Sequence, residues 1–113
     1  MSHKYNARAT FYDGVWFPSQ AEADRYKELK LAEAAGEIKY LLLHPKYILQ
    51  DTFKDNTGKK QSAIHYIADF KYLETATANW VVEDVKGVET PVFKLKAKMF
   101  KKLYPNLELR IVR

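Results

Sequence analysis

Two opposite charges stand inside a segment that otherwise has the composition of a buried strand, the run VVEDVKG at residues 81–87. Alternate side chains of a strand share a face, so Asp84 and Lys86 point to one side and Glu83 points to the other. Burying such an ion costs several kcal/mol unless a partner or a metal ion compensates its charge. The presence of Asp84 and Lys86 in this strand therefore needs an explanation.

Three further charges lie where the local pattern predicts apolar residues. Glu22 begins the apolar stripe of an expected helix, and Lys96 projects from the apolar side of a later helix. Asp69 ends an apolar run on the strand that precedes the strand of Asp84. Because a short turn would make these two strands antiparallel neighbours, we expect Asp69 to converge with Asp84 and Lys86.

The elements that must position these charges can be bounded from turns, caps and periodicity. An Asp-Gly dipeptide predicts a tight hairpin turn, and a Ser-x-x-Glu capping box predicts the start of the first helix, which a glycine ends. The four strands that follow suggest a meander, with a tight turn at Pro45 between the first two. The expected elements are a hairpin at residues 10–12 and 15–17, a helix at 20–35, strands at 38–43, 47–53, 64–73 and 80–86, a helix at 92–104 and a strand at 107–112.

The composition is that of one ordinary globular domain over residues 1–113, with 47% hydrophobic and 29% charged residues. Cysteine is absent, which excludes disulfides and thiolate metal sites and favours an intracellular setting. The N-terminal residues lack the apolar run of a signal peptide, and no stretch approaches the roughly 18 apolar residues of a membrane span. We therefore expect a soluble, cytoplasmic protein that does not contact a membrane.

The net charge of +5 is confined to the C-terminal segment. Residues 1–83 contain 11 basic and 11 acidic side chains, whereas residues 84–113 contain 8 and 3. This asymmetry is typical of proteins that bind a polyanion, although a solvated basic face without a partner has the same composition. Four lysines on the polar side of the last helix are candidates for contacts with DNA phosphates: Lys94, Lys98, Lys101 and Lys102.

The order of these residues resembles the PD-(D/E)XK nuclease superfamily. Asp69, a turn and then the triplet Asp84-Val85-Lys86 have the order of its motif, although Ala68 stands where the superfamily name has proline. More closely, the chain resembles a small phage-encoded endonuclease-like family catalogued as a domain of unknown function, and it is similar to phage Holliday-junction resolvase-like nucleases. The segments that carry this likeness are KYNA, YDGVWFPSQAEADRY, IADF, VVEDVKG, LKAKMF and YPN.

The resemblance implies a restriction-endonuclease-like αβββαβ core, in which two helices flank a central mixed sheet and an N-terminal β-hairpin is added. It also implies that Asp69 and Asp84 hold Mg²⁺, with Mn²⁺ as a substitute and the Val85 carbonyl as a further ligand, because hard cations take oxygen donors. Glu22 would be a metal ligand or act through a bound water. Lys86 would orient or deprotonate the attacking water.

The function that the resemblance implies is a Mg²⁺-dependent endodeoxyribonuclease, encoded by a phage or prophage and acting in the cytoplasm of the bacterial host. Branched DNA is the substrate that the resolvase likeness suggests, and a homodimer would provide two active sites for paired incisions. Lys96 would add a phosphate contact from the second core helix. The alternative is a DNA-binding accessory or packaging protein that keeps the nuclease fold without activity, and a third reading is an interaction module that uses the aromatic hairpin.

Several of these residues also have simpler interpretations. Glu22 could fold back onto Ser19 as part of its capping box, and Asp84 with Lys86 could form an ion pair on a solvated strand. Asp69 alone could be a turn residue. For three aromatic residues we expect core packing rather than base stacking: Trp16, Phe17 and Trp80.

The three histidines give weaker signals. His65 shares a strand face with Asp69 and could approach the site, but a histidine satisfied in the core or at the surface is the commoner case. His3 and His44 show no spacing typical of metal ligands.

Overall fold

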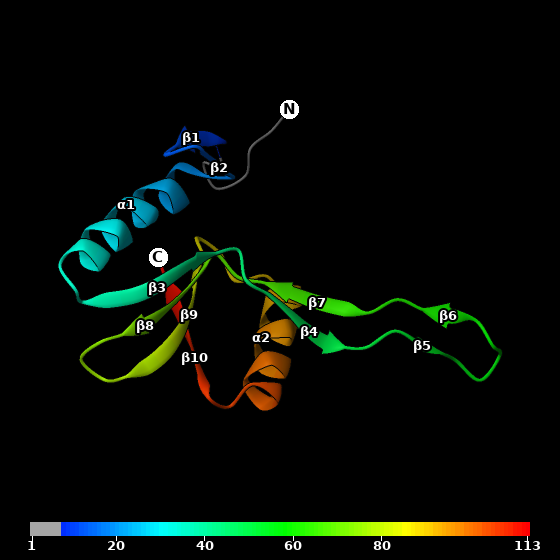
Figure 1. Cartoon of the computed structure of the whole chain (residues 1–113). Helices are drawn as coiled ribbons and strands as arrows, with labels where there is room; N and C mark the ends of the chain where they lie inside the picture. Colours follow the sequence, from blue (N-terminus) through cyan, green and yellow to red (C-terminus); the bar gives the residue numbers. More distant parts are fainter. Residues whose placement is uncertain (1–7) are drawn as a thin grey trace.

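The computed structural model describes residues 8–113, so His3 and the KYNA segment lie outside the described residues. The predicted fold class is confirmed, because the described residues include two helices, a central mixed sheet and an N-terminal antiparallel hairpin (Figure 1). Neither described helix is long and apolar enough to cross a membrane. The elements are β1 (Thr10–Tyr12), β2 (Val15–Phe17), α1 (Gln20–Ala34), β3 (Ile38–Leu43), β4 (Lys46–Gln50), β5 (Phe53–Lys54), β6 (Lys60–Gln61), β7 (Ile64–Ile67), β8 (Phe70–Glu74), β9 (Asn79–Val85), α2 (Pro91–Leu103) and β10 (Leu107–Val112).

The predicted N-terminal hairpin is formed by β1 and β2, which pair antiparallel across Asp13 and Gly14. Both turn residues have positive φ, 54° and 75°, as a tight two-residue turn requires. Phe17 is fully buried under α1, in line with its predicted packing. The expectation for Trp16 is wrong, because its side chain alternates to the other face of the hairpin and is 67% exposed.

The strands predicted at residues 38–43, 47–53 and 64–73 form one long bent hairpin, so the four-stranded meander is wrong. β3 pairs with β8, β4 with β7 and β5 with β6, all antiparallel. The chain bends at His44 and Pro45 and does not reverse there. The opposite strand bends at the same level, around Ala68 and Asp69, and two backbone hydrogen bonds join the strands at this point. The N–H of His44 donates to the carbonyl of Asp69 (2.9 Å), and the N–H of Ala68 donates to the carbonyl of Pro45 (3.0 Å).

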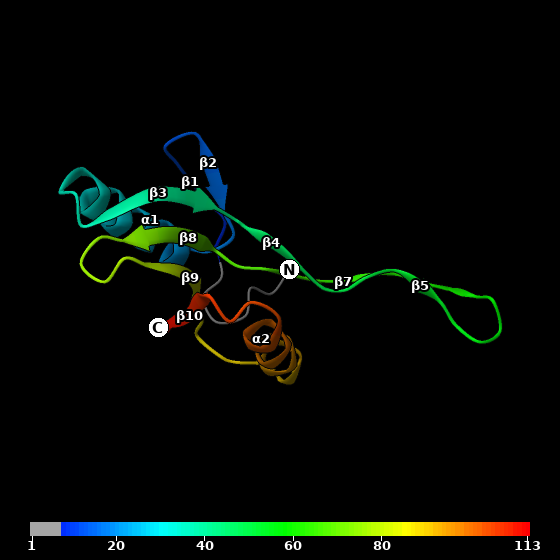
Figure 2. The ribbon, with the colours of Figure 1, turned by 60° about the horizontal axis from the view of Figure 1, so that its bottom comes forward.

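The central sheet has the strand order β10-β9-β8-β3. β9 is antiparallel to β8 and parallel to β10, with Phe70 opposite Glu83 on one side and Ile111 opposite Asp84 on the other. α2 provides the connection between the two parallel strands. Figures 1 and 2 show α1 on one side of the sheet and α2 on the other.

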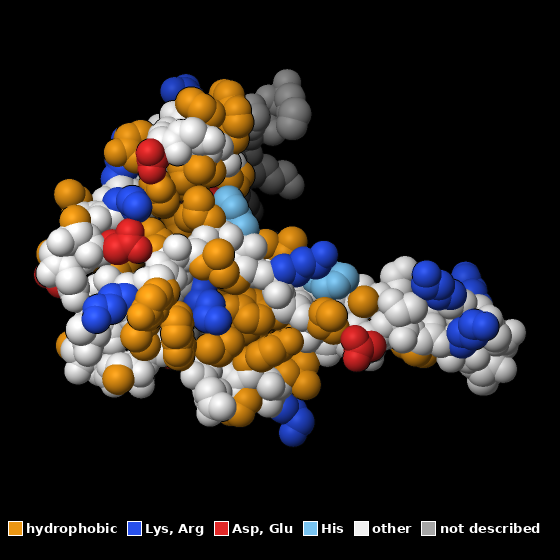
Figure 3. Space-filling view, in the orientation of Figure 1, with side chains coloured by type: hydrophobic (Ala, Val, Ile, Leu, Met, Phe, Trp, Pro, Cys, Tyr) orange, Lys and Arg blue, Asp and Glu red, His pale blue; other side chains and the backbone are white. Residues whose placement is uncertain are grey.

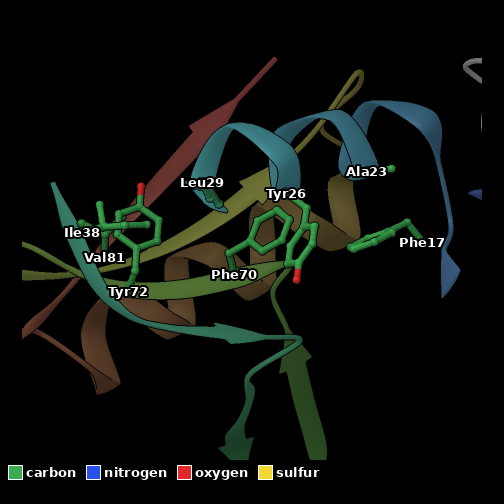
Figure 4. Close-up of a cluster of buried hydrophobic side chains, with 8 residues drawn as sticks. All are labelled: Phe17, Ala23, Tyr26, Leu29, Ile38, Phe70, Tyr72 and Val81. Atoms are coloured by element: carbon green, nitrogen blue, oxygen red, sulfur yellow. The ribbon is translucent and has the colours of Figure 1, made fainter. Parts of the chain in front are cut away.

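Each helix covers its own aromatic core. Between α1 and the sheet, Tyr26 and Leu29 pack with residues of β3, β8 and β9, as the close-up in Figure 4 shows. On the other face, α2 buries Phe93, Ala97 and Phe100 against β4, β7 and Val82. Trp80 is only partly buried, and its ring lies 5.9 Å from that of the exposed Tyr40.

Beyond the bend, the hairpin continues as a two-stranded arm that extends from the body of the molecule (Figures 1 and 2). The extents of 54, 41 and 24 Å reflect this shape. Asp55 organises the turn at the tip, because its carboxylate accepts hydrogen bonds from the N–H groups of Thr57 (2.9 Å) and Lys59 (3.1 Å) and from the side chain of Gln61 (2.9 Å). Basic side chains gather at the tip in Figure 3, and the lysines of this turn are Lys54, Lys59 and Lys60.

Candidate active site

The bend of the long hairpin brings charged residues from four separate segments to one end of the central sheet. Asp69 stands between β7 and β8, and its backbone N–H donates to the carbonyl of Glu83 on β9 (3.1 Å). Its carboxylate accepts a hydrogen bond from the N–H of Val85 (2.7 Å). These two bonds fix both the backbone and the side chain of Asp69 against β9, beside Asp84.

The surroundings of Asp69 disfavour its charge. Burial is the main cause that raises its pKa to about 6, and the neighbouring Glu22 carboxyl raises it further. The hydrogen bond from Val85 acts in the opposite direction. A nearby cation favours the ionised form of a carboxyl group, so a bound metal ion would lower the pKa of Asp69.

Asp84 is 2% exposed, and the hydroxyl of Tyr66 donates a hydrogen bond to its carboxylate. Burial, followed by the negative charge of Asp69, raises the pKa of Asp84 to about 7, against which Tyr66 and Lys86 act. Asp69 and Asp84 therefore lie close enough to influence each other's ionisation. This is the convergence that the order of the two strands predicts.

Glu22 reaches the same place from the first turn of α1. Its N–H donates to the Oγ of Ser19 (3.1 Å), which confirms half of the capping box. Its carboxylate, however, points into the site, where Oε2 lies 3.0 Å from Nε2 of His44. Glu22 is 4% exposed, and burial is the main cause of its raised pKa, with Asp84 raising it and Lys86 lowering it.

His44 is a candidate site residue that the sequence analysis missed, because it shows no sequence spacing typical of metal ligands. One ligand atom each from Glu22, His44 and Asp69 lie within 4.8 Å of one another, so these three side chains could hold a metal ion. The partners are 22 and 25 positions away along the chain, so no local spacing could reveal them. The available signal was Pro45, which directly follows His44 and interrupts the strand.

Lys86 and Lys96 line one groove of about 810 Å³ between β7 and α2, together with His65. The ammonium group of Lys86 lies 4.6 Å from the centre of the Phe93 ring. Its charge lowers the pKa of both Glu22 and Asp84, so it stands within electrostatic reach of the carboxyl cluster. His65 lies on this groove and not among the three possible metal ligands.

The other predicted phosphate-binding lysines lie elsewhere on α2. Their side chains are exposed, whereas Lys96 is half-buried in the groove. The structure thus separates Lys96 from the four lysines on the solvent side of the helix: Lys94, Lys98, Lys101 and Lys102.

The backbone of Val85 faces the same site. Its N–H points to Asp69, whereas the next N–H along the chain, that of Lys86, points the opposite way and donates to Val112 of β10 (2.8 Å). In an extended strand the N–H and C=O of one residue point to the same side. The Val85 carbonyl is therefore directed toward the edge of β9 that carries Asp69.

Glu83 is a second residue whose role the sequence analysis missed. It is fully buried on the α1 side of β9, where it accepts two hydrogen bonds from Arg25 of α1 (2.7 and 2.9 Å) and one from the hydroxyl of Tyr72 (2.7 Å). Such a bidentate guanidinium–carboxylate pair is among the strongest hydrogen-bonded pairs in proteins. Because Arg25 follows Glu22 by three positions and Glu83 precedes Asp84, this pair ties the two halves of the site together.

Comparisons with known proteins add a family without a described activity. Searches of curated proteins and of solved structures found no significant match. A family described as "Protein of unknown function (DUF1064)" matches residues 2–113. Since this match covers nearly the whole chain, the protein belongs to that family.

Proposed function

We propose that the protein is a metal-dependent DNA endonuclease of the PD-(D/E)XK type. The observation that carries this proposal is the convergence of three carboxylates and one ammonium group at one end of the sheet: Glu22, Asp69, Asp84 and Lys86. Burial, and to a smaller extent the repulsion between neighbouring carboxylates, raises the pKa values of the three carboxyls. A divalent cation would offset the cost of ionising them, and oxygen donors of this kind are the ligands that Mg²⁺ and Mn²⁺ take.

The donor set fits such an ion. Glu22 and Asp69 offer ligand atoms within 4.8 Å of each other, and with Asp84 beside Asp69 these carboxylates would hold it, with the Val85 carbonyl directed to the same edge of β9. When bound, a divalent ion would shield the charge of a phosphate and make a water molecule more acidic. The residues around it supply rigidity, because Tyr66 holds Asp84 and the N–H of Val85 holds Asp69.

Lys86 is the residue that would interact with the attacking water and with the phosphate. Its ammonium group lies over the Phe93 ring, on the groove and within electrostatic reach of the carboxyl cluster. From there it can orient a water molecule and stabilise the negative charge that develops on the phosphate. Lys96 lines the same groove and would contact the next phosphate.

Two other surfaces support DNA as the partner. The lysines on the solvent side of α2 and those at the tip of the arm lie outside the groove, and phosphate neutralisation by lysine is the main source of affinity for DNA. A two-stranded ribbon also has the width to enter the major groove of a duplex. We further propose action in the cytoplasm of a bacterial host that carries a phage or prophage, in line with the resemblance.

A plasmid-nicking assay tests the proposal, with Mg²⁺, with Mn²⁺ and with EDTA, and with linear, single-stranded and four-way-junction DNA as further substrates. We expect cleavage that EDTA abolishes, that Asp84→Ala reduces below detection, and that Lys86→Ala lowers by about 10²–10³-fold. Lys39→Ala, at an exposed lysine of β3 outside the groove and the proposed DNA-binding surfaces, is the matched control and should retain the parent rate within a few-fold. Cleavage by Asp84→Ala at the parent rate would contradict the assignment. DNA binding without any cleavage would instead support an inactive accessory or packaging protein.

A homodimer is the second part of the proposal, because paired incisions in branched DNA need two active sites. The N-terminal hairpin offers apolar surface for it, since Phe11 and Trp16 are 56% and 67% exposed and their rings lie 5.0 Å apart. Sedimentation at micromolar concentration should show a dimer that Trp16→Ala weakens. A parent protein that sediments only as a monomer would exclude this part of the proposal.

A further inference from the structure

His44 adds a nitrogen donor to a site whose other side-chain donors are carboxylates. Its Nε2 atom lies 3.0 Å from Oε2 of Glu22, and both side chains offer ligand atoms in one cluster with Asp69. Two neighbouring ligands of an octahedral ion with bonds of about 2.1 Å are about 3 Å apart. The spacing of the two atoms is therefore suited to holding one ion between them, as well as to a direct hydrogen bond.

The backbone of His44 is arranged to present its side chain at this point. Its φ of 51° is in the left-handed region, which residues other than glycine rarely adopt and which carries strain. The bond from its N–H to the carbonyl of Asp69 maintains this conformation, and the buried Pro45 follows directly. Because Asp69 thus fixes the backbone of His44 and contributes its own carboxylate, the two donors are held as one unit.

We propose that His44 is a metal ligand and that the centre formed by Glu22, His44 and Asp69 selects a divalent transition-metal ion over Mg²⁺. This inference rests on the proposed metal-dependent function and deepens it. Mg²⁺ prefers oxygen donors and gives up its water reluctantly, whereas an imidazole nitrogen favours first-row transition metals. Mn²⁺ is the ion in this class that also accepts several carboxylates, and Zn²⁺ is the alternative that a small donor set can hold.

Binding of the metal alone to the full chain, measured by calorimetry without DNA, tests the selectivity. We expect Mn²⁺ or Zn²⁺ to bind at least about tenfold more tightly than Mg²⁺, and His44→Asn to lose about 10–100-fold in affinity for the transition metal. Asparagine tolerates the left-handed conformation and offers an oxygen, so Mg²⁺ binding should change by no more than about threefold. His65→Ala, a histidine on the neighbouring groove, is the matched control and should bind like the parent. Equal affinities for Mn²⁺, Zn²⁺ and Mg²⁺ in the parent protein would overturn the proposal.

Electron spin-echo modulation of the Mn²⁺-loaded protein tests the ligand itself. A directly bound imidazole nitrogen modulates the echo, so the parent and His65→Ala should show the ¹⁴N signal and His44→Asn should lose it. Persistence of the signal in His44→Asn, or its absence in the Mn²⁺-loaded parent, would overturn the proposal. His44→Gly, which removes the side chain without backbone strain, gives the same readout if the asparagine variant folds poorly.

The two proposals can fail separately. A ¹⁴N signal that depends on His44, together with no cleavage of any DNA substrate, would leave the metal centre in place and refute the nuclease. Metal-dependent cleavage without that signal would support the nuclease proposal and refute His44 as a ligand, so that only oxygen donors would hold the metal ion.

Discussion

The buried charge of Asp84 gives a quantitative prediction about stability. Replacing Asp84 by asparagine removes the charge but keeps the shape and an oxygen that can accept the hydrogen bond from Tyr66. If the carboxylate is present for metal binding rather than for folding, the metal-free variant must be more stable than the parent at neutral pH. Residues selected for function at a cost in stability commonly behave in this way.

The magnitude follows from the pKa of Asp84, which burial and the Asp69 carboxylate raise from 3.8 to about 7. At about 1.4 kcal/mol for each pH unit, ionising Asp84 in the folded protein costs about 4 kcal/mol relative to the unfolded chain. The variant also gives up the attraction between Asp84 and Lys86. We therefore expect the Asp84→Asn variant to gain about 2–4 kcal/mol at pH 8 in EDTA, or about 8–16 °C in Tm for a domain of this size.

The pH dependence provides the sign of the effect. Because the pKa of Asp84 is higher in the folded protein than in the unfolded chain, the folded protein binds more protons between about pH 4 and pH 7. The parent should therefore lose stability as pH rises through this window, and the gain of Asp84→Asn should grow over the same range. Thermal unfolding in EDTA at pH 4, 6 and 8 measures this, with Asp51→Asn as a control on an exposed carboxylate.

One result would refute the reasoning. If Asp84→Asn is less stable than the parent at pH 8, or if the difference between them does not shrink toward pH 4, the ionised carboxylate is stabilised by its neighbours. Asp84 and Lys86 would then form a structural ion pair, which is the simpler interpretation of the sequence. Excess Mn²⁺ adds a second check, because bound metal should raise the Tm of the parent far more than that of the variant.

Two further predictions concern residues outside the carboxyl cluster. Arg25→Ala leaves the charge of Glu83 buried without its partner, so it should lower the free energy of unfolding by about 3–5 kcal/mol. Chemical denaturation should show that adding Glu83→Gln recovers part of this loss, whereas additive effects of the two substitutions would contradict the pairing. Replacing Lys59 and Lys60 by alanine removes two exposed charges at the tip of the arm. The slope of log affinity for duplex DNA against log salt concentration should therefore decrease in magnitude by about two, and an unchanged slope would exclude the arm from the DNA contact.

Elements that local signals define could be predicted from the sequence. The Asp-Gly turn, the Ser19 cap and Gly36 bound the hairpin and α1, and the strand at residues 107–112 is observed at the predicted positions. The convergence of Asp69 with Asp84 was also predictable, because it needs only two sequential strands joined by a turn. These features follow from caps, turns and hydrophobic periodicity, which are visible in short stretches of sequence.

The bend and the partners across it could not be predicted in this way. Whether residues 64–73 form one strand or two depends on the bond from His44 to the Asp69 carbonyl, which joins segments 25 positions apart. The same holds for Arg25 and Glu83, which lie 58 positions apart. The alternation of β9 places Glu83 on a buried face, so it shows that a partner must exist without showing which residue provides it.

The two charged residues of β9 have opposite effects on the stability of the fold: the charge of Asp84 lowers it, whereas the hydrogen-bonded charge of Glu83 helps to hold α1 against the sheet. Asp84 points to a buried cluster of carboxyls, where burial and the negative charge of Asp69 disfavour its ionised form unless a cation binds. Glu83 points to the other face, where Arg25 and Tyr72 compensate its charge and tie α1 to the sheet. Glu22 lies one turn before Arg25 on α1. The pair between Arg25 and Glu83 on one face of β9 therefore keeps Glu22 close to Asp84 on the other face, despite the repulsion between these two carboxylates. Arg25→Ala should therefore loosen Glu22 from the proposed metal centre before the domain unfolds, which calorimetry would detect as weaker Mn²⁺ binding by a protein that is still folded.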